Sequence, residues 1–244
     1  MTRRRWIADE VSGDTAALVG EHAVHLARVL RAEVGQEFDI STGDEVRRGT
    51  ITTISYDRVE FALDAKPHRR LRPLPSAAPK ITLALAIFKF DRMEWAIEKC
   101  TEIGVARIIP VIARRTDAHL ATAAVKRQER WERIVRQAAE QSRRVAPPEV
   151  AAPVKLKELP SVFPAGELTR VVLAESEEDT RLGDVLQSRP NEVVLAVGPE
   201  GGWASGEFSW FFEEGWVAAS LGDTILRAET AAIVATALAL EALR

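Results

Sequence analysis

The stretch AVGPEGGWASGEF, at residues 196–208, contains the residues with the clearest potential for chemistry. It continues an apolar run and places Gly198, Gly201, Gly202 and the carboxylate of Glu200 close together. A tight turn needs only one or two glycines. The surplus predicts a loop whose exposed main-chain N–H and C=O groups hold a ligand. Taken alone, the motif is explained equally well as a structural turn.

A second cluster, LRAET, contains Arg227 and Glu229 and stands directly before a final apolar helix. Capping of that helix by Thr230 or Glu229 would be a purely structural explanation. It leaves Arg227 unexplained, because a cation near a helix N-terminus opposes the helix dipole. A bound anion or a carboxylate partner would offset that repulsion. The two clusters together therefore favour a chemical site.

The ligand of such a site is constrained by what the sequence lacks. It has no G-x-G-x-x-G in a first βα turn and no G-x-x-x-x-G-K-[ST], so the glycine-rich loop is not a standard phosphate cradle. The loops in question are acidic, with Glu175, Glu177, Glu178 and Glu200. They disfavour a polyphosphate and suit a cationic or neutral ligand. S-adenosylmethionine, with its sulfonium and amino group, is compatible with that description.

The elements that must position these loops alternate between strand and helix. We expect strands at 81–88, 105–112, 170–175, 191–198 and 216–222. Between them we expect helices, including one that Asp91 caps and Gly104 ends, one from Val125 to Arg144, one near 205–214 and one from 229 to 243. This alternation predicts a parallel sheet covered on both faces. Ligands bind beyond the carboxyl ends of such strands, so the loops AESEEDT, GPEGG and LGDTILRAET should converge if their strands are neighbours.

The first part of the chain has a different pattern. EFDIS, GTITTIS and VEFALD read as strands, TGDEVRRG as a hairpin-like turn and HAVHLARVLR as a helix. The stretch KPHRRLRPLPSAAP, at 66–79, has the composition of a linker. We therefore place a domain boundary there, which gives domains at 1–72 and 73–244.

Composition narrows the setting. Residues 1–150 carry 26 basic against 21 acidic side chains, whereas residues 151–244 carry 7 against 15, which hints at a polyanion partner for the first part. No apolar run is long enough for a membrane span, and we expect a cytoplasmic protein without a secretory signal or membrane partner. The single cysteine excludes an internal disulfide, and we expect no metal, since His22 and His25 lack a third ligand.

These motifs resemble one family. GPEGGWASGEF followed by LGDTILRAETA is similar to the C-terminal signature of the RsmE family, SPOUT-class methyltransferases that act on N3 of a uridine in small-subunit (16S) rRNA. Three further segments resemble the family over nearly the whole chain: HAVHLARVLR, KFDRMEWAIEKCTEIGV and RWERIVRQAAEQSRR. Arg143 departs from the pattern, because the family usually has a glycine at this position, followed by an arginine. Both Arg143 and Arg144 therefore stay candidates for the role of that arginine.

The resemblance implies a fold, a cofactor and a set of roles. The fold would be a small N-terminal PUA-like β-barrel for RNA and a C-terminal α/β trefoil-knot domain that dimerises with a second copy. The cofactor would be S-adenosylmethionine, and the partner small-subunit rRNA or the 30S particle. Arg227 and Glu229 would be catalytic. Glu229 would either accept the proton or only orient Arg227. The residues assigned to the cofactor are Leu173, Glu175, Gly198, Glu200, Gly201, Gly202, Ser220, Leu221, Gly222, Ile225 and Leu226. We expect a bulky residue at Gly201 to be especially damaging.

For RNA we single out basic residues in the first part and at the end of the long helix. They are Arg3, Arg4, Arg5 beside Trp6, Arg28, Arg31, Arg143 and Arg144, with Arg69, Arg70 and Arg72 in the linker. A solvated basic surface is the alternative for each one. Trp131 is expected in the core.

Three other functions compete. One is a SPOUT-like enzyme that methylates another RNA or a ribose 2′-hydroxyl. Another is a non-catalytic RNA-binding protein that keeps the fold, which would not need both the GPEGG and LRAET clusters. The third is a Rossmann-type nucleotide enzyme, which the missing glycine fingerprint disfavours.

Overall fold

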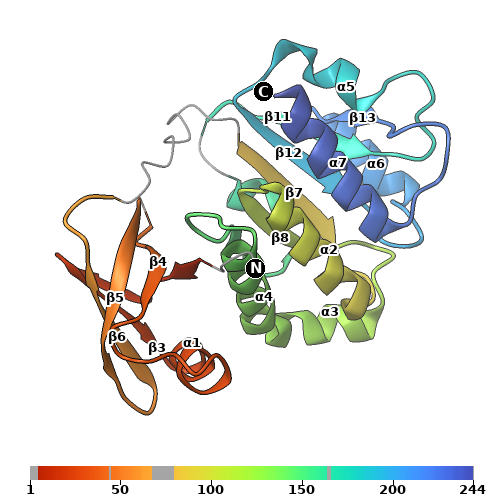
Figure 1. Ribbon diagram of the computed structural model, residues 1–244. Helices are drawn as coiled ribbons and strands as arrows, with labels where there is room; N and C mark the ends of the chain where they lie inside the picture. The colour runs from red at the N-terminus through yellow and green to blue at the C-terminus, as the bar shows by residue number, and fades with distance from the viewer. Residues whose placement is uncertain (1–4, 44, 68–79, 164–165, 244) are drawn as a thin grey trace. The chain divides into compact units, whose positions relative to one another are not determined.

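The computed structural model describes residues 5–43, 45–67, 80–163 and 166–243 (Figure 1). By their contacts, Met1–Ser76 and Ala139–Pro147 form one unit, and Ala77–Ala138 and Pro148–Arg244 form the other. We call them the N-terminal and C-terminal units. Most of the expected linker, with Arg69, Arg70 and Arg72, lies outside the described residues.

The N-terminal unit is built on a curled six-stranded sheet with the order β1-β4-β5-β6-β3-β2. Its strands are β1 (Trp6–Ile7), β2 (Glu10–Ser12), β3 (Thr15–Val19), β4 (Glu37–Ser41), β5 (Val46–Ile54) and β6 (Arg58–Leu63). The predicted hairpin is confirmed, because β4 and β5 pair antiparallel across residues 42–45. In the described part of this sheet β1 and β2 are edges, so the small barrel that we expected takes the form of a curled half-barrel.

The helix predicted at residues 22–31 is only partly correct. The chain forms one α-helical turn, α1 (Glu21–Val24), and then a π-helix, η1 (His25–Val29). Leu26 of η1 is fully buried in the core of the unit, together with Trp6, Leu18, Ile40 and Phe61.

The C-terminal unit contains the predicted parallel sheet, and every pairing in it is parallel. Its order is β10-β8-β7-β12-β11-β13, with β9 paired to β8. The strands are β7 (Lys80–Ala86), β8 (Arg107–Ile112), β9 (Glu149–Val150), β10 (Val154–Lys155), β11 (Thr169–Leu173), β12 (Glu192–Val197) and β13 (Val217–Ala219).

Helices cover both faces of this sheet (Figure 1). On one face, Leu83 and Leu85 of β7 pack in a core with α2 (Phe90–Ile103), α4 (Gln128–Gln141) and α7 (Ala228–Ala242). On the other face, Ala84 and Ala86 pack in a core with α6 (Ser205–Glu213). Strand residues alternate between faces, so each strand serves both cores. The remaining helical segments are α3 (Ala118–Ala124), η2 (Val125–Arg127), η3 (Leu156–Val162), α5 (Leu182–Val185) and η4 (Leu186–Ser188).

Two predicted helix boundaries are wrong. Helix α2 starts at Phe90 with Lys89 in the N-cap position, so Asp91 lies in the first turn and does not cap. The long helix expected from Val125 to Arg144 is α4, which ends at Gln141; residues 118–127 form α3 and η2 before it. Its early end coincides with Arg143, which has a positive φ of 61° that an α-helix does not accept. Gly104 ends α2 as predicted, with φ 131°.

Helix α7 begins after Arg227, whose side chain makes no capping hydrogen bond. Neither Glu229 nor Thr230 is the cap, so the structural explanation of the LRAET cluster is wrong. Helix α7 packs beside α2 over the sheet (Figure 1). Across the described residues, no helix is both long and apolar enough to cross a membrane.

Candidate functional site

A cavity of about 520 Å³ lies at the carboxyl ends of β11, β12 and β13. These strands are neighbours, because β11 pairs with both β12 and β13 in parallel register. The loops that leave them line the cavity together. The predicted convergence of the three loops is therefore confirmed.

Most residues that the sequence singled out line this cavity. The lining members are Leu173, Glu175, Gly198, Glu200, Gly202, Ser220, Leu221, Gly222, Ile225, Leu226 and Arg227. Gly201 and Glu229 are not among the lining residues. Glu177 and Glu178 are also absent from the lining, and the Glu177 carboxylate instead accepts hydrogen bonds from the amides of Asp179 and Thr180.

The loop at residues 198–204, which we call the braced loop, is held by the protein itself. The buried carboxylate of Glu207 accepts hydrogen bonds from the amides of Ala204 and Arg114, each 2.7 Å long. The Arg115 guanidinium donates to the Gly201 carbonyl oxygen. This loop therefore keeps its shape without a ligand.

The glycines of the braced loop have different reasons to be glycine. Gly202 has φ +68°, a conformation that L side chains rarely adopt. At Gly198 a Cβ would lie 3.2 Å from Nε1 of the buried Trp203. At Gly201 a Cβ would meet only the flexible Arg115 side chain, at 3.4 Å. Gly202 therefore carries the conformational constraint of the loop, and the damage expected from a bulky residue at Gly201 stays a prediction.

The loop at residues 221–226, which we call the open loop, has the opposite character. Within the described part of the chain, its main-chain N–H and C=O groups make no hydrogen bonds. The hydrogen-bonded structure before it stops at Ser220, which pairs with Thr180 and Leu182, and α7 begins at Ala228. Residues 223–225 are exposed, so the main-chain groups of this loop are open to solvent and to a polar ligand in the cavity.

The charge of the cavity is mixed. Three carboxylates line it, Glu175, Glu200 and Asp223, and so do three cations, Lys89, Arg92 and Arg227. We expected the cavity to be acidic, from the loops alone. Two of the cations were missed because they come from the entry to α2 and not from the three loops. The site therefore suits a ligand that carries both positive and negative groups.

Arg92 connects the braced loop to the first turn of α7. Its Nη1 lies 3.0 Å from Oε1 of Glu200, and its Nε lies 3.9 Å from Oε1 of Glu229. The Glu229 side chain is about nine-tenths buried, and its Oε2 has no hydrogen-bond partner among the described residues. A buried carboxylate is costly without a nearby cation, and Arg92 is that cation.

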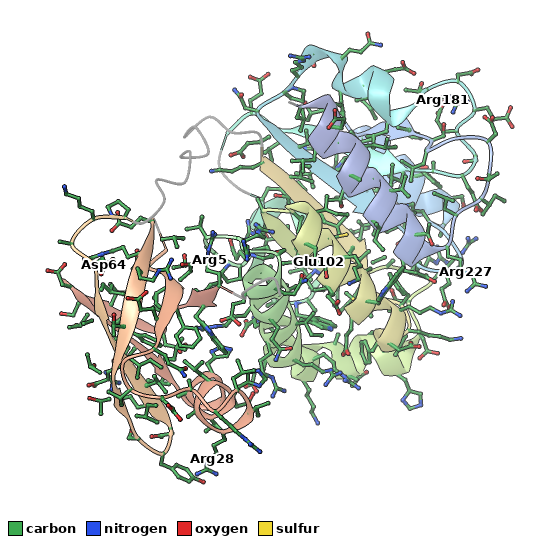
Figure 2. The ribbon with its side chains drawn as sticks, viewed as in Figure 1. Arg5, Arg28, Asp64, Glu102, Arg181 and Arg227 are labelled. Atoms are coloured by element: carbon green, nitrogen blue, oxygen red, sulfur yellow. The ribbon has the colours of Figure 1, made fainter. Side chains whose placement is uncertain are left out.

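Arg227 is arranged differently. It lines the cavity and is exposed, and no ion pair joins it to a described carboxylate. Figure 2 shows it in the loop before α7. The hypothesis that Glu229 orients Arg227 finds no support, because the partner of Glu229 is Arg92.

Sequence reasoning missed several lining residues. They are Lys89, Arg92, Ala174, Ser176, Val197, Pro199, Trp203, Phe208, Ala219, Asp223, Thr224, Ala228 and Ala231. For Lys89 and Arg92 a signal existed, since both are fixed positions of the motif at 89–105 that resembles the family. Their place beside β12 follows from the pairing of β7 with β12, which the sequence does not state.

The residues predicted to bind RNA fall into different environments. Arg3 and Arg4 lie outside the described residues. Arg5 is buried, and its guanidinium donates to the Arg143 carbonyl, so it is not a surface contact as predicted. Trp6 is 1% exposed in the core and cannot be a stacking platform. The predicted burial of Trp131 is confirmed.

The other predicted RNA residues are at least partly accessible. Arg28, Arg31 and Arg143 are exposed, and Arg144 is half-buried. Burial lowers the pKa of Arg144 to about 10, so it stays a cation at neutral pH. The positive φ of Arg143 accounts for the glycine that is usual at this position of the motif.

The single cysteine is not reactive, and the described residues contain no metal site. Cys100 is buried against Thr236, and burial raises the pKa of its thiol to about 12, so it is not a nucleophile. In the described residues no three His, Cys, Asp or Glu side chains are grouped to hold a metal ion.

Known proteins are similar to this chain over most of its length. A model of the RNA methyltransferase domain matches residues 75–240. The ribosomal RNA small subunit methyltransferase E of Synechocystis sp. is 33% identical over 94% of this chain and 74% of its own length. The protein of that name from Mycobacterium tuberculosis is 34% identical over 92% of this chain and 85% of its own length.

Solved structures are also similar to this chain. The ribosomal RNA small subunit methyltransferase E of Neisseria gonorrhoeae, bound to S-adenosylmethionine, has a TM-score of 0.80 and 30% identity, covering 96% of this chain and 95% of that one. A methyltransferase of Legionella pneumophila in complex with the same cofactor has a TM-score of 0.83 and 29% identity, covering 99% and 98%.

Proposed function

Because the chain belongs to the RsmE family of ribosomal RNA small subunit methyltransferases, we propose that it methylates N3 of a uridine in small-subunit (16S) rRNA with S-adenosylmethionine. The observation that carries this proposal is the cavity at the ends of β11, β12 and β13, one wall of which is the open loop. Among the alternatives, a non-catalytic RNA-binding protein would have no use for such a cavity.

The residues present fit this cofactor. A volume of about 520 Å³ falls within the usual range for cofactor sites. The free N–H and C=O groups of residues 221–226 suit an adenine edge and a ribose. Glu175, Glu200 and Asp223 suit the sulfonium and the amino group, and the cations suit the carboxylate. We propose that the lining residues of the three loops hold the cofactor, and that Gly201 supports them indirectly.

Binding can be measured without activity. Hydrogen exchange followed by mass spectrometry should show that S-adenosylmethionine protects the amides of 221–226 strongly and those of 198–204 weakly. The open loop gains partners on binding, whereas in the braced loop the amides of Gly202 and Ala204 already donate to Pro199 and Glu207 and should show the smallest change. Equal protection of both loops, or none, would contradict the assignment.

When bound, S-adenosylmethionine supplies an activated methyl group on its sulfonium. N3 of uracil carries a proton at neutral pH and attacks poorly until that proton leaves. We propose that Arg227 stabilises the negative charge that develops on the O2 or O4 atom of the base. Arg227 is exposed at the cavity and forms no ion pair with a carboxylate of the described residues, and both observations support this role.

Two roles are chemically open to Glu229. It can accept the N3 proton through an intervening water, or it can position Arg92 and thereby Glu200. Its burial away from the cavity lining and its 3.9 Å separation from Arg92 support the second role. We propose Glu229 as a residue that acts through Arg92.

We further propose that residues 1–72 bind RNA, that residues 73–244 carry out the transfer and that the chain acts as a homodimer in the cytoplasm. The match of the methyltransferase model to residues 75–240 supports the division of labour. Sedimentation of the purified chain with and without S-adenosylmethionine tests the dimer, and a monomer at micromolar concentration would contradict it.

The decisive assay uses small-subunit particles that lack the modification, labelled S-adenosylmethionine and mass spectrometry of the nucleosides. A 3-methyluridine product is the expected result. A methylated ribose or another base would retain the cofactor and overturn the target. No transfer, together with no cofactor binding by calorimetry, would overturn the proposal as a whole.

A further inference from the structure

Four consecutive residues of the N-terminal unit, Arg28 to Arg31, point their side chains into solvent. Two are guanidinium groups and two are large apolar side chains, with Val29 63% and Leu30 51% exposed. Tyr56, the sole tyrosine of the chain, is 75% exposed. Single exposed apolar residues are ordinary, but this combination of apolar groups, cations and a ring is not.

The backbone presents this segment by two uncommon conformations. Residues His25–Val29 form a π-helix, a geometry that occurs mostly in short pieces and often at functional sites. Arg31 then takes a left-handed conformation with φ 52°. The segment is anchored at both ends, because Leu26 and Ala32 are buried and the Ala32 amide donates to the Leu26 carbonyl at 3.2 Å. The exposed residues between them are therefore displayed from a fixed base.

Tyr56 belongs to the same surface. It lies in the turn between β5 and β6, which the hydrogen bond from the Ser55 amide to the Arg58 carbonyl closes at 2.8 Å. The guanidinium carbon of Arg28 lies 4.6 Å from the centroid of the Tyr56 ring. Figure 2 shows Arg28 at the surface beside the helical segment. One face of the ring is thus covered by a cation, and its high exposure leaves the other face accessible.

We propose that Tyr56 and residues 28–31 form a binding site for one unpaired nucleotide of the RNA substrate; this inference rests on the proposed function. The base stacks on the accessible face of Tyr56, and Arg28 and Arg31 contact the adjacent phosphates. Exposed aromatic rings next to guanidinium groups are the usual means of holding single-stranded RNA.

Neighbouring charges decide what kind of RNA contact this is. Glu33 and Asp57 are exposed in the same segments and offset the two arginines. A surface that tracks a duplex through its phosphates needs a net positive charge. Here stacking must supply most of the affinity, so the site favours a flipped-out or loop nucleotide.

The test uses the full-length chain and the small-subunit particles of the decisive assay, whose rRNA lacks the modification. Tyr56→Ala should raise the KM for RNA roughly 5- to 100-fold, the range for loss of one base–aromatic stack. Tyr56→Phe, which keeps the ring, should stay within about twofold of the wild type. The Kd for S-adenosylmethionine and the kcat at saturating RNA should not change. Phe212→Ala removes an exposed ring from α6 and is the matched control.

A second measurement does not depend on a variant's folding. RNA containing 5-iodouridine, cross-linked to the wild-type chain by light, should yield a peptide modified at Tyr56. Methyl transfer by the wild type with an unchanged KM in Tyr56→Ala would overturn this inference and leave the proposed function intact. A cross-link confined to other segments would overturn it as well. Absence of methyl transfer by the wild type would instead count against the proposed function.

Discussion

The two loops that line the cavity, the braced loop and the open loop, differ in how their polar groups are used. The braced loop has its shape fixed by Glu207, Arg115 and Arg92. The open loop makes no main-chain hydrogen bonds to described residues. One wall is therefore preorganised, and the other is completed by the ligand. A rigid wall limits the entropy lost on binding, whereas a wall of free amides and carbonyls supplies specific contacts.

Arg227 stands at the end of the open loop, and its replacement should have the largest effect. Arg227→Ala should lower kcat about 100- to 1000-fold, as expected when one preorganised charge is removed from a developing anion. The Kd for S-adenosylmethionine should change little, because the free main-chain groups remain and Lys89 and Arg92 still offer cations to the cofactor carboxylate. Single-turnover methylation and calorimetry measure the two quantities. A wild-type rate in this variant would refute the catalytic role.

The braced loop is best disrupted at Gly202. Gly202→Val forces a β-branched residue into φ +68°, which costs about 1–3 kcal/mol of strain. We expect cofactor affinity to fall roughly tenfold or more, measured by calorimetry, because the preorganised wall is distorted. Gly201→Ala is the matched control, since its Cβ meets only the Arg115 side chain. Equal losses in both variants would mean that the loop is not braced in the way described.

The difference between these glycines marks a limit of sequence reasoning. The convergence of the three loops was predictable, because parallel strands end at one edge of a sheet. The choice between Gly201 and Gly202 was not, because φ depends on what the loop packs against. The same limit explains Trp6, which lies buried in the short strand β1 paired with β4, and Arg5, which is buried just before it with its guanidinium on the Arg143 carbonyl.

Arg92 shows a second limit. Its position one turn into α2 was visible in the motif that resembles the family, but its role was not. The role depends on β7 lying next to β12, which brings the start of α2 to Glu200 and Glu229. Pairing order in a parallel sheet is a tertiary property, so residues that act across strands are the ones most readily missed.

The connection that Arg92 makes between the braced loop and the first turn of α7 can be weakened by Glu229→Gln. The amide keeps the size of the side chain but removes the charge that attracts Arg92 across 3.9 Å, so we expect kcat to fall less than about tenfold. Loss of a general base would cost roughly 100-fold or more. The pH–rate profile separates the two cases. If Glu229 only positions Arg92, the fall in rate at low pH, the acidic limb of the profile, persists in the variant. A large loss with a vanished acidic limb would make Glu229 the proton acceptor.

The smallest effect should come from removing the ion pair that a side chain of the open loop makes. Arg181 donates to Asp223 at 2.7 Å, and both side chains are exposed. Exposed ion pairs contribute about 0.2–1 kcal/mol, so Arg181→Ala should raise the Kd for S-adenosylmethionine by less than about fivefold. The difference from wild type should shrink in high salt, because exposed charges are screened. A larger, salt-independent loss would mean that the open loop is braced after all, and the contrast between the two walls would no longer hold.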